Sequence, residues 1–189
     1  MSWGITMKYI EKTNYQFDLD HLNFEWKYIQ DFVLTNDQWY RTQTCLQHSK
    51  DCVNKYTDGC GSIKRADGSV PASDFCLIND IYRGTIFEAI INELNVVRSR
   101  IMIIDKHRTY SSVHADRTKR SHFVLNTNPY AFFIFPKNPI EKSEIIHIPS
   151  EVIHIPADGY VYTVDTTKPH MFVNAGEGSR THLIMSHRP

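Results

Sequence analysis

Short apolar runs rich in β-branched and aromatic residues dominate the chain after residue 97. Turn-forming sequences separate these runs, for example at residues 128–129, 158–159 and 176–178. Several short strands at regular intervals are typical of a sandwich or barrel, and a jelly roll closes such strands into two facing sheets with a mouth for ligands. The pattern predicts strands at residues 101–104, 123–125, 131–135, 144–148, 151–155, 160–164, 170–173 and 180–185.

Two segments before residue 97 have helical periodicity instead. The first follows Asp20, which we expect to cap the helix. The second opens with the tetrapeptide 85–88, Thr-Ile-Phe-Glu, whose Thr and Glu have the spacing of a capping box. Residues 1–20 are polar and leave room for one edge strand, and residues 35–80 are irregular. The apolar face of the first helix consists of Leu22, Trp26, Ile29 and Val33.

The composition of the 189-residue chain is that of one folded domain, with 41% hydrophobic and 22% charged residues. We expect a single domain over 1–189, in which a helical and loop-rich part, 1–97, covers a β-barrel core, 98–189. The 21 Lys and Arg residues balance the 21 Asp and Glu residues, so neither nucleic acid nor an anionic membrane is an expected partner.

The sequence also predicts a cytoplasmic protein. No apolar run approaches the ~20 residues that span a bilayer, and the first residues lack the basic and apolar regions of a signal peptide. Four cysteines without a secretion signal are expected to be reduced, and their spacing contains no Cys-x-x-Cys of the kind that zinc sites use. These cysteines are Cys45, Cys52, Cys60 and Cys76.

Candidate metal ligands follow the polar turn after residue 104. Side chains two apart in a strand point to the same face, so His114 and Asp116 are expected to project together. One further imidazole, for which His170 is the candidate, completes two His and one carboxylate. Such a set binds one face of an octahedral metal and leaves the other face open. Nitrogen and oxygen ligands suit Fe(II) and oxygen chemistry, and the cysteines lie elsewhere in the sequence.

A cation near this set suits an α-keto acid co-substrate with a second carboxylate. Arg180 lies in a predicted strand that follows His170 after a glycine-rich turn, and we expect a hairpin to bring the two close. The planar fork of a guanidinium matches a carboxylate. Arg120 and His122 share one strand face just after the proposed ligands, and they are candidates for further donors to the same co-substrate.

Two other interpretations stay open at this point. A lone His-x-Asp is a weak signal and a strand arginine is usually a surface charge. The alternative is therefore a non-catalytic jelly-roll module that binds a metal or a ligand. A third interpretation is a cupin-type isomerase or dioxygenase without 2-oxoglutarate, although such enzymes usually employ more His ligands and would leave Arg180 unexplained.

A succession of motifs extends from about Gln47 to the C-terminus. In order, they are 58–62, 83–85, 98–102, 110–116, 120–122, 155–170, Asn174 and 180–183. This succession resembles the aspartyl/asparaginyl β-hydroxylase family of Fe(II)- and 2-oxoglutarate-dependent dioxygenases. The resemblance implies a double-stranded β-helix, the cupin-like jelly roll. It also implies Fe(II) bound by His114, Asp116 and His170, and 2-oxoglutarate bound by Arg180 with help from Arg120 and His122.

The resemblance further implies an enzyme that hydroxylates an unactivated carbon of an amino acid or of an aspartyl/asparaginyl-like peptide. Dioxygen would be consumed, and succinate and CO2 would be released. The carboxylate of such a substrate needs a cation, for which Arg41 and Arg100 are the candidates. The loop 35–62 is the expected lid over the barrel mouth. The sequence indicates no oligomeric state.

Overall fold

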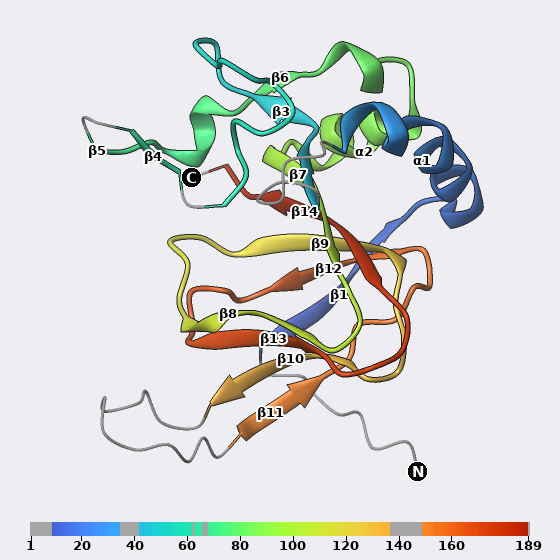
Figure 1. Ribbon diagram of the computed structural model, residues 1–189, viewed down its shortest axis with the longest axis vertical. Coiled ribbons are helices and arrows are strands. Elements are labelled where there is room, and N and C mark those ends of the chain that lie inside the picture. Colours follow the sequence, from blue (N-terminus) through green and yellow to red (C-terminus); the bar gives the residue numbers. More distant parts are fainter. Residues whose placement is uncertain (1–8, 35–41, 62, 66–67, 137–148, 189) are drawn as a thin grey trace.

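Two antiparallel β-sheets that face each other form the centre of the protein (Figure 1). The computed structural model describes residues 9–34, 42–61, 63–65, 68–136 and 149–188. The six-stranded sheet has the order β1 (Ile10–Gln16), β12 (Tyr160–Val164), β9 (Arg120–Asn126), β14 (Arg180–Ser186), β7 (Val97–Ile104) and β2 (Gln43–Cys45). The four-stranded sheet has the order β11 (Pro149–Ile153), β10 (Ala131–Pro136), β13 (His170–Asn174) and β8 (Arg108–His114).

From β7 to β14 the chain passes repeatedly between these sheets. Strands β7, β9, β12 and β14 belong to the six-stranded sheet, and β8, β10, β11 and β13 belong to the four-stranded sheet. This alternation defines a double-stranded β-helix, and the predicted fold class, mostly β with flanking helices, is confirmed. The predicted strand 160–164 coincides with β12, whereas the predicted strand 144–148 lies outside the described residues.

Helices cover the outer face of the six-stranded sheet, so that this sheet is buried on both sides. Figure 1 shows α1 (Leu19–Val33) and α2 (Ile86–Leu94) on the side away from β10 and β11. Alternate residues of β7 consequently enter different cores. Met102 and Ile104 pack between the two sheets, and Ile101 packs with the helices. Across the described part of the chain, no helix combines the length and apolar character needed to cross a lipid bilayer.

The remaining described elements are short and lie between β2 and α2. They are the strands β3 (Gln47–His48) and β6 (Leu77–Ile78), which pair with each other, the paired strands β4 (Lys64–Arg65) and β5 (Gly68–Ser69), and the 3-10 turns η1 (Ala72–Asp74) and η2 (Asp80–Tyr82). The described residues between 42 and 80 therefore form an irregular layer with little pairing of its own, as the polar sequence of this region predicts.

Both helix N-termini differ from their predicted caps. In α1, the carboxylate of Asp18 accepts the His21 N–H at 2.9 Å, so that Asp18 and not Asp20 is the N-cap. Asp20 instead lies in the first turn, where its negative charge interacts favourably with the positive end of the helix dipole. The prediction was wrong because both aspartates precede the apolar face, and only the backbone geometry decides between them.

At α2, the reciprocal capping box does not form. The Glu88 carboxylate accepts the Gly84 N–H at 2.7 Å, one residue before the predicted donor, and the Thr85 hydroxyl donates to the Tyr82 carbonyl. A carboxylate from α1 caps this N-terminus, since Glu25 accepts the Ile86 N–H at 2.9 Å. This bond joins α1 to the N-terminus of α2.

A buried amide at the end of β13 ties three segments of the barrel together. The side-chain nitrogen of Asn174 donates to the carbonyls of Ile104, Asp105 and Gly178 at 2.9–3.1 Å. Its oxygen accepts from the Asn128 side chain at 2.9 Å. Because these bonds cross from the β13–β14 turn to the end of β7, they fix where β14 begins.

We expect Asn174→Ala to lower the free energy of unfolding by about 3 kcal/mol, because it removes several hydrogen bonds of a buried amide, among them the one to the Ile104 carbonyl. Urea unfolding followed by circular dichroism measures this. The matched control is Asn126→Ala, in an exposed residue that donates one hydrogen bond, to the Ser179 carbonyl. The control should cost less than about 0.5 kcal/mol. Equal losses in the two variants would contradict the anchoring role of Asn174.

Candidate metal centre

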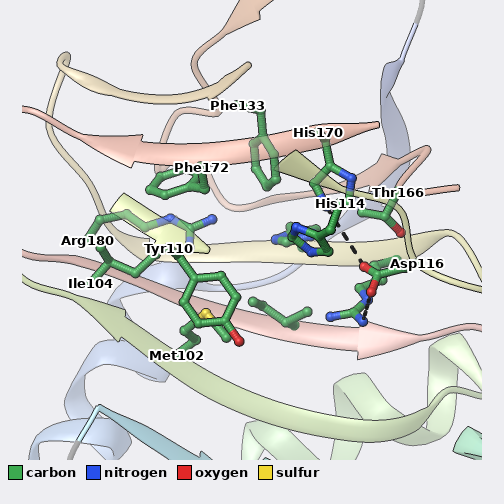
Figure 2. A pocket seen from close by; sticks show the side chains of 13 residues that line it. Met102, Ile104, Tyr110, His114, Asp116, Phe133, Thr166, His170, Phe172 and Arg180 are labelled. Carbon is green, nitrogen blue, oxygen red and sulfur yellow. Dashed lines mark hydrogen bonds and ion pairs between the residues drawn. The ribbon is translucent and has the colours of Figure 1, made fainter. Parts of the chain in front are cut away.

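Two histidines and one aspartate converge at the mouth of the barrel (Figure 2). His114 ends β8 and His170 begins β13, and the two residues are direct partners in the antiparallel pair of these strands. Asp116 follows two residues after the end of β8. One ligand atom from each of the three lies within 4.8 Å of the others, with His170 Nε2 at 3.9 Å from an Asp116 oxygen. The structure therefore brings the three predicted ligands together.

Asp116 reaches this position from beyond the strand. Its backbone N–H donates to the carbonyl of Thr166 at 2.7 Å, and the Thr166 hydroxyl donates to the carbonyl of Thr118 at 2.6 Å. The segment before β13 therefore holds the carboxylate. The strand alternation that predicted the pairing of His114 with Asp116 is not what places it, because β8 ends at His114.

Hydrogen bonds fix which nitrogen each imidazole presents. The Nδ1 atoms of His114 and His170 lie 3.0 and 2.9 Å from the carbonyls of Ser112 and Lys168, two residues earlier in the chain. A carbonyl only accepts, so Nδ1 of each ring donates to it, and Nε2 is the nitrogen left to bind a metal. Burial lowers the pKa of His170, and the neighbouring His114 acts in the same direction. Both effects favour the neutral imidazole, which is the form that binds metals.

This donor set fits a divalent first-row metal. It offers two imidazole nitrogens and one carboxylate oxygen within 4.8 Å of one another, and no cysteine belongs to the cluster among the described residues. Three protein ligands leave further coordination positions for small molecules. Orientation of each ligand by a backbone carbonyl, as here, is the usual support of metal-binding histidines.

A buried guanidinium occupies the opposite end of the same pocket (Figure 2). Arg180 begins β14, is only 1% exposed, and stacks on the Phe172 ring, with its guanidinium carbon 3.8 Å from the ring centroid. It also donates a hydrogen bond to Nδ1 of His182. The predicted hairpin with His170 is wrong, because β13 and β14 belong to different sheets. Arg180 faces the cluster from the opposite sheet instead.

The charge of Arg180 has no acidic partner among the described residues that line the pocket. The one carboxylate there, on Asp116, is paired with Arg120 at 2.7 Å. Burial lowers the pKa of Arg180, yet a guanidinium keeps its proton in proteins. The imidazoles of His122 and His182 are neutral, because burial and the charge of Arg180 lower their pKa. The pocket is therefore suited to an anion from outside the chain.

The pocket has apolar walls and, together with the solvent space at its mouth, a volume of about 400 Å³. The structure places His122 near Arg180, since its Nδ1 lies 3.4 Å from that of His182, and it places Arg120 beside Asp116 at the metal end. The predicted co-substrate residues are thus in one pocket, at its two ends. The apolar lining residues are Met102, Ile104, Phe133, Phe172 and Ile184.

A second, larger cavity, about 1130 Å³ together with the solvent space at its mouth, meets the first at Asp116 and Arg120. Burial, reinforced by the charge of Arg100, lowers the pKa of Arg98 to about 9 and that of Arg120 to about 10. Asp116 is the one acidic side chain among the described residues that line this cavity. The cavity walls are residues 61, 63, 70–73, 98, 115–118, 120 and 186–187.

The two predicted substrate cations differ in outcome. Arg100 is 2% exposed and lines neither cavity, and its Nε and Nη1 have no hydrogen-bond partner among the described residues. Arg41 lies outside the described residues, as do residues 35–40 of the expected lid. The residue that sequence reasoning missed is Arg98. The available signal was the alternation of Arg98, Arg100 and Met102 along one face of β7.

The fold and the cluster together define a double-stranded β-helix with a His–Asp–His site at its mouth. The structure is similar to that of IDO from Bacillus thuringiensis, with a TM-score of 0.50 and 12% identity over 95% of this chain and 90% of that chain. A Pseudomonas putida prolyl-4-hydroxylase gives a TM-score of 0.44 and 11% identity over 95% and 93% of the two chains. No protein-family model and no curated protein matches the sequence. The similarity to the Bacillus thuringiensis structure supports the β-rich fold, and the resemblance to aspartyl/asparaginyl β-hydroxylases stays a prediction.

Titration with Co(II), followed by its visible absorption, tests the cluster as a metal site. We expect His170→Ala and His114→Ala each to weaken binding by more than about 100-fold, because loss of a ligand costs more than loss of its supporting hydrogen bond. The control is His21→Ala, in an exposed residue of α1 that should leave binding unchanged. Circular dichroism verifies that each variant is folded. Unchanged affinity in both ligand variants would remove the histidines from the site.

Proposed function

We propose that this chain is an Fe(II)- and 2-oxoglutarate-dependent dioxygenase that hydroxylates an unactivated carbon of an amino acid or of an aspartyl/asparaginyl-like peptide. One observation carries the proposal: a single pocket contains both the His–Asp–His cluster and a buried guanidinium without an acidic partner among the described lining residues. A co-substrate with a metal-binding end and a separate carboxylate matches both features.

His114, Asp116 and His170 would hold the iron. When bound, the iron supplies the activation of dioxygen and the oxidative decarboxylation of 2-oxoglutarate to succinate and CO2. The chain itself binds and orients. Arg180 binds the distal carboxylate of 2-oxoglutarate as a planar fork, and the stacked Phe172 ring holds the guanidinium in place. The apolar walls exclude water and strengthen this ion pair.

The larger cavity is the entry that this proposal assigns to the substrate. It adjoins the cluster at Asp116 and Arg120, so a molecule in it lies beside the metal ligands. Arg98 and Arg120 on its walls, with Arg100 buried behind them, give it a positive potential that favours a carboxylate-bearing molecule. The sequence resemblance to aspartyl/asparaginyl β-hydroxylases supports the same class of substrate.

Binding of 2-oxoglutarate is tested by mixing the protein anaerobically with Fe(II) and 2-oxoglutarate. We expect the visible charge-transfer band of the chelate. Arg180→Gln should raise the 2-oxoglutarate concentration needed for half-maximal absorbance by about 100-fold, because a buried charged hydrogen-bond partner is lost. The matched control is Arg108→Gln, in an exposed residue of β8, which should leave the requirement unchanged. An equal requirement in both variants would reassign the carboxylate site.

Turnover distinguishes the enzyme from a jelly-roll module that only binds metal and ligand. We expect succinate release to rise with aspartate, asparagine, glutamate, glutamine or short peptides that contain them, and not with the same compounds when every carboxylate is amidated. The reason is the cationic lining of the larger cavity. His114→Ala should abolish the release. If the chelate band forms but none of these compounds stimulates succinate release, the binding module is favoured.

A further inference from the structure

Two buried cysteines, 15 residues apart in the sequence, lie in contact beside the larger cavity. Cys45 ends β2, and Cys60 follows the turn at Asp58 and Gly59. Their sulfur atoms are 3.4 Å apart, and the residues are 1% and 5% exposed. Both are free cysteines in the structure, and neither takes part in the His–Asp–His cluster. Their spacing in the sequence does not predict that they meet.

The surroundings make the two sulfurs unequal. The Gly59 N–H donates to Cys45 Sγ at 3.1 Å. The hydrogen bond with Cys60 lowers the pKa of Cys45, and the charges of Arg98 and Arg100 act in the same direction. The same hydrogen bond, together with burial, raises the pKa of Cys60. Cys45 is therefore the sulfur disposed to be a thiolate, which is the nucleophilic form, and Cys60 keeps the proton.

The turn between these cysteines and the cavity is held by one side chain. Arg98 donates from Nε to the Gly59 carbonyl at 3.0 Å and from Nη2 to the Gly61 carbonyl at 2.6 Å. Both Arg98 and Gly61 line the larger cavity. Gly59 itself is tightly packed, because an added Cβ would lie 3.3 Å from both Cys45 Sγ and the Phe75 ring. A shift of Cys60 toward Cys45 therefore moves the turn that Arg98 holds.

We propose that Cys45 and Cys60 are a reversible disulfide site, and that closing the bond draws the 59–61 turn away from Arg98 and reshapes the wall of the larger cavity. A disulfide places its sulfurs about 2.05 Å apart, so they must approach from their present separation. Formation of the bond does not depend on the function proposed above. The consequence for substrate binding rests on that function.

Hydrogen peroxide is the oxidant that balances the reaction. The Cys45 thiolate attacks one peroxide oxygen and the O–O bond breaks, which forms the Cys45 sulfenic acid and releases hydroxide. The hydroxide takes up the proton that the Cys45 thiol had lost and becomes water. The Cys60 sulfur then attacks the Cys45 sulfur and expels its oxygen as a second water. The two thiol hydrogens thus leave in two water molecules, and the two electrons of the thiols reduce the peroxide. A dithiol reductant reverses the change.

The chain offers its own controls. Cys76 is exposed, and Cys52 Sγ lies 3.2 Å from Nδ1 of His48, where burial and the charge of Asp58 raise its pKa. The double variant C52S/C76S removes these thiols and leaves the proposed pair and its packing intact. The matched variants C45S and C60S each remove one member of the pair.

The test treats the metal-free full chain, and C52S/C76S, with hydrogen peroxide, followed by peptide mapping and thiol counting. We expect both thiols of C52S/C76S to be lost together, a cross-link between the peptides that contain Cys45 and Cys60, and recovery with dithiothreitol. Sulfinic acid at either residue without a cross-link would overturn the site, and so would two persisting thiols when Cys76 of the natural chain is fully oxidised. C45S and C60S should form no internal cross-link.

Hydrogen exchange tests the effect on the cavity wall without any need for activity. We expect the amides of residues 57–61 to exchange about tenfold faster in oxidised than in reduced C52S/C76S. The amides of β13 and β14 should exchange at the same rate in both forms. The chelate band with Fe(II) and 2-oxoglutarate, measured after excess peroxide is removed, should also be unchanged, since Arg180 lies in the other pocket. A cross-link without a change in exchange at 57–61 would overturn the coupling to the cavity. Absence of the chelate band in both redox forms would instead count against the proposed function alone.

Discussion

The charge of Arg180 is the constraint on which the candidate site depends. A guanidinium removed from water is costly unless it is paired or hydrogen-bonded, and here the chain supplies an aromatic face and a neutral imidazole in place of a carboxylate. The interior of the barrel therefore holds a positive charge that no carboxylate among the described lining residues balances. An anionic ligand pairs with that charge, so the affinity for it comes from a guanidinium that the fold already holds in place.

The two sheets divide the work of holding the site. The histidine ligands come from neighbouring strands of the four-stranded sheet, β8 and β13, whereas Arg120, His122 and Arg180 come from the six-stranded sheet. The distance between the metal end and the anion end is thus set by how the sheets pack. The aromatic side chains of Phe133 and Phe172 lie between them and belong to the same core cluster. Because the six-stranded sheet is also covered by α1 and α2, its inner face has little freedom to adjust.

Local patterns in the sequence are enough to predict most strands after residue 97, the helical periodicity of α1 and the three residues of the cluster. They fail where the deciding contact is distant in the chain. Asp116 is placed by Thr166, α2 is capped by Glu25, and Arg180 reaches the pocket across the barrel instead of along a hairpin. The role of Arg98 was hidden for the same reason, because its guanidinium binds carbonyls nearly forty residues earlier. Spacing along the chain identifies residue types that suit a site, and only the packing of the sheets shows which of them meet.

Asp116 links the two cavities electrostatically. It is the one carboxylate among the described residues that line either cavity, and the guanidiniums of Arg98, Arg117, Arg120 and Arg180 line one or both. Its carboxylate already forms an ion pair with Arg120, and a metal ion at the cluster would neutralise part of the same negative charge. Both cavities then become more positive, since neither has another described acid to compensate. On the proposed function, occupation of the metal site therefore strengthens the attraction for both the diacid in the smaller pocket and a carboxylate in the larger one, without any change in the shape of the chain.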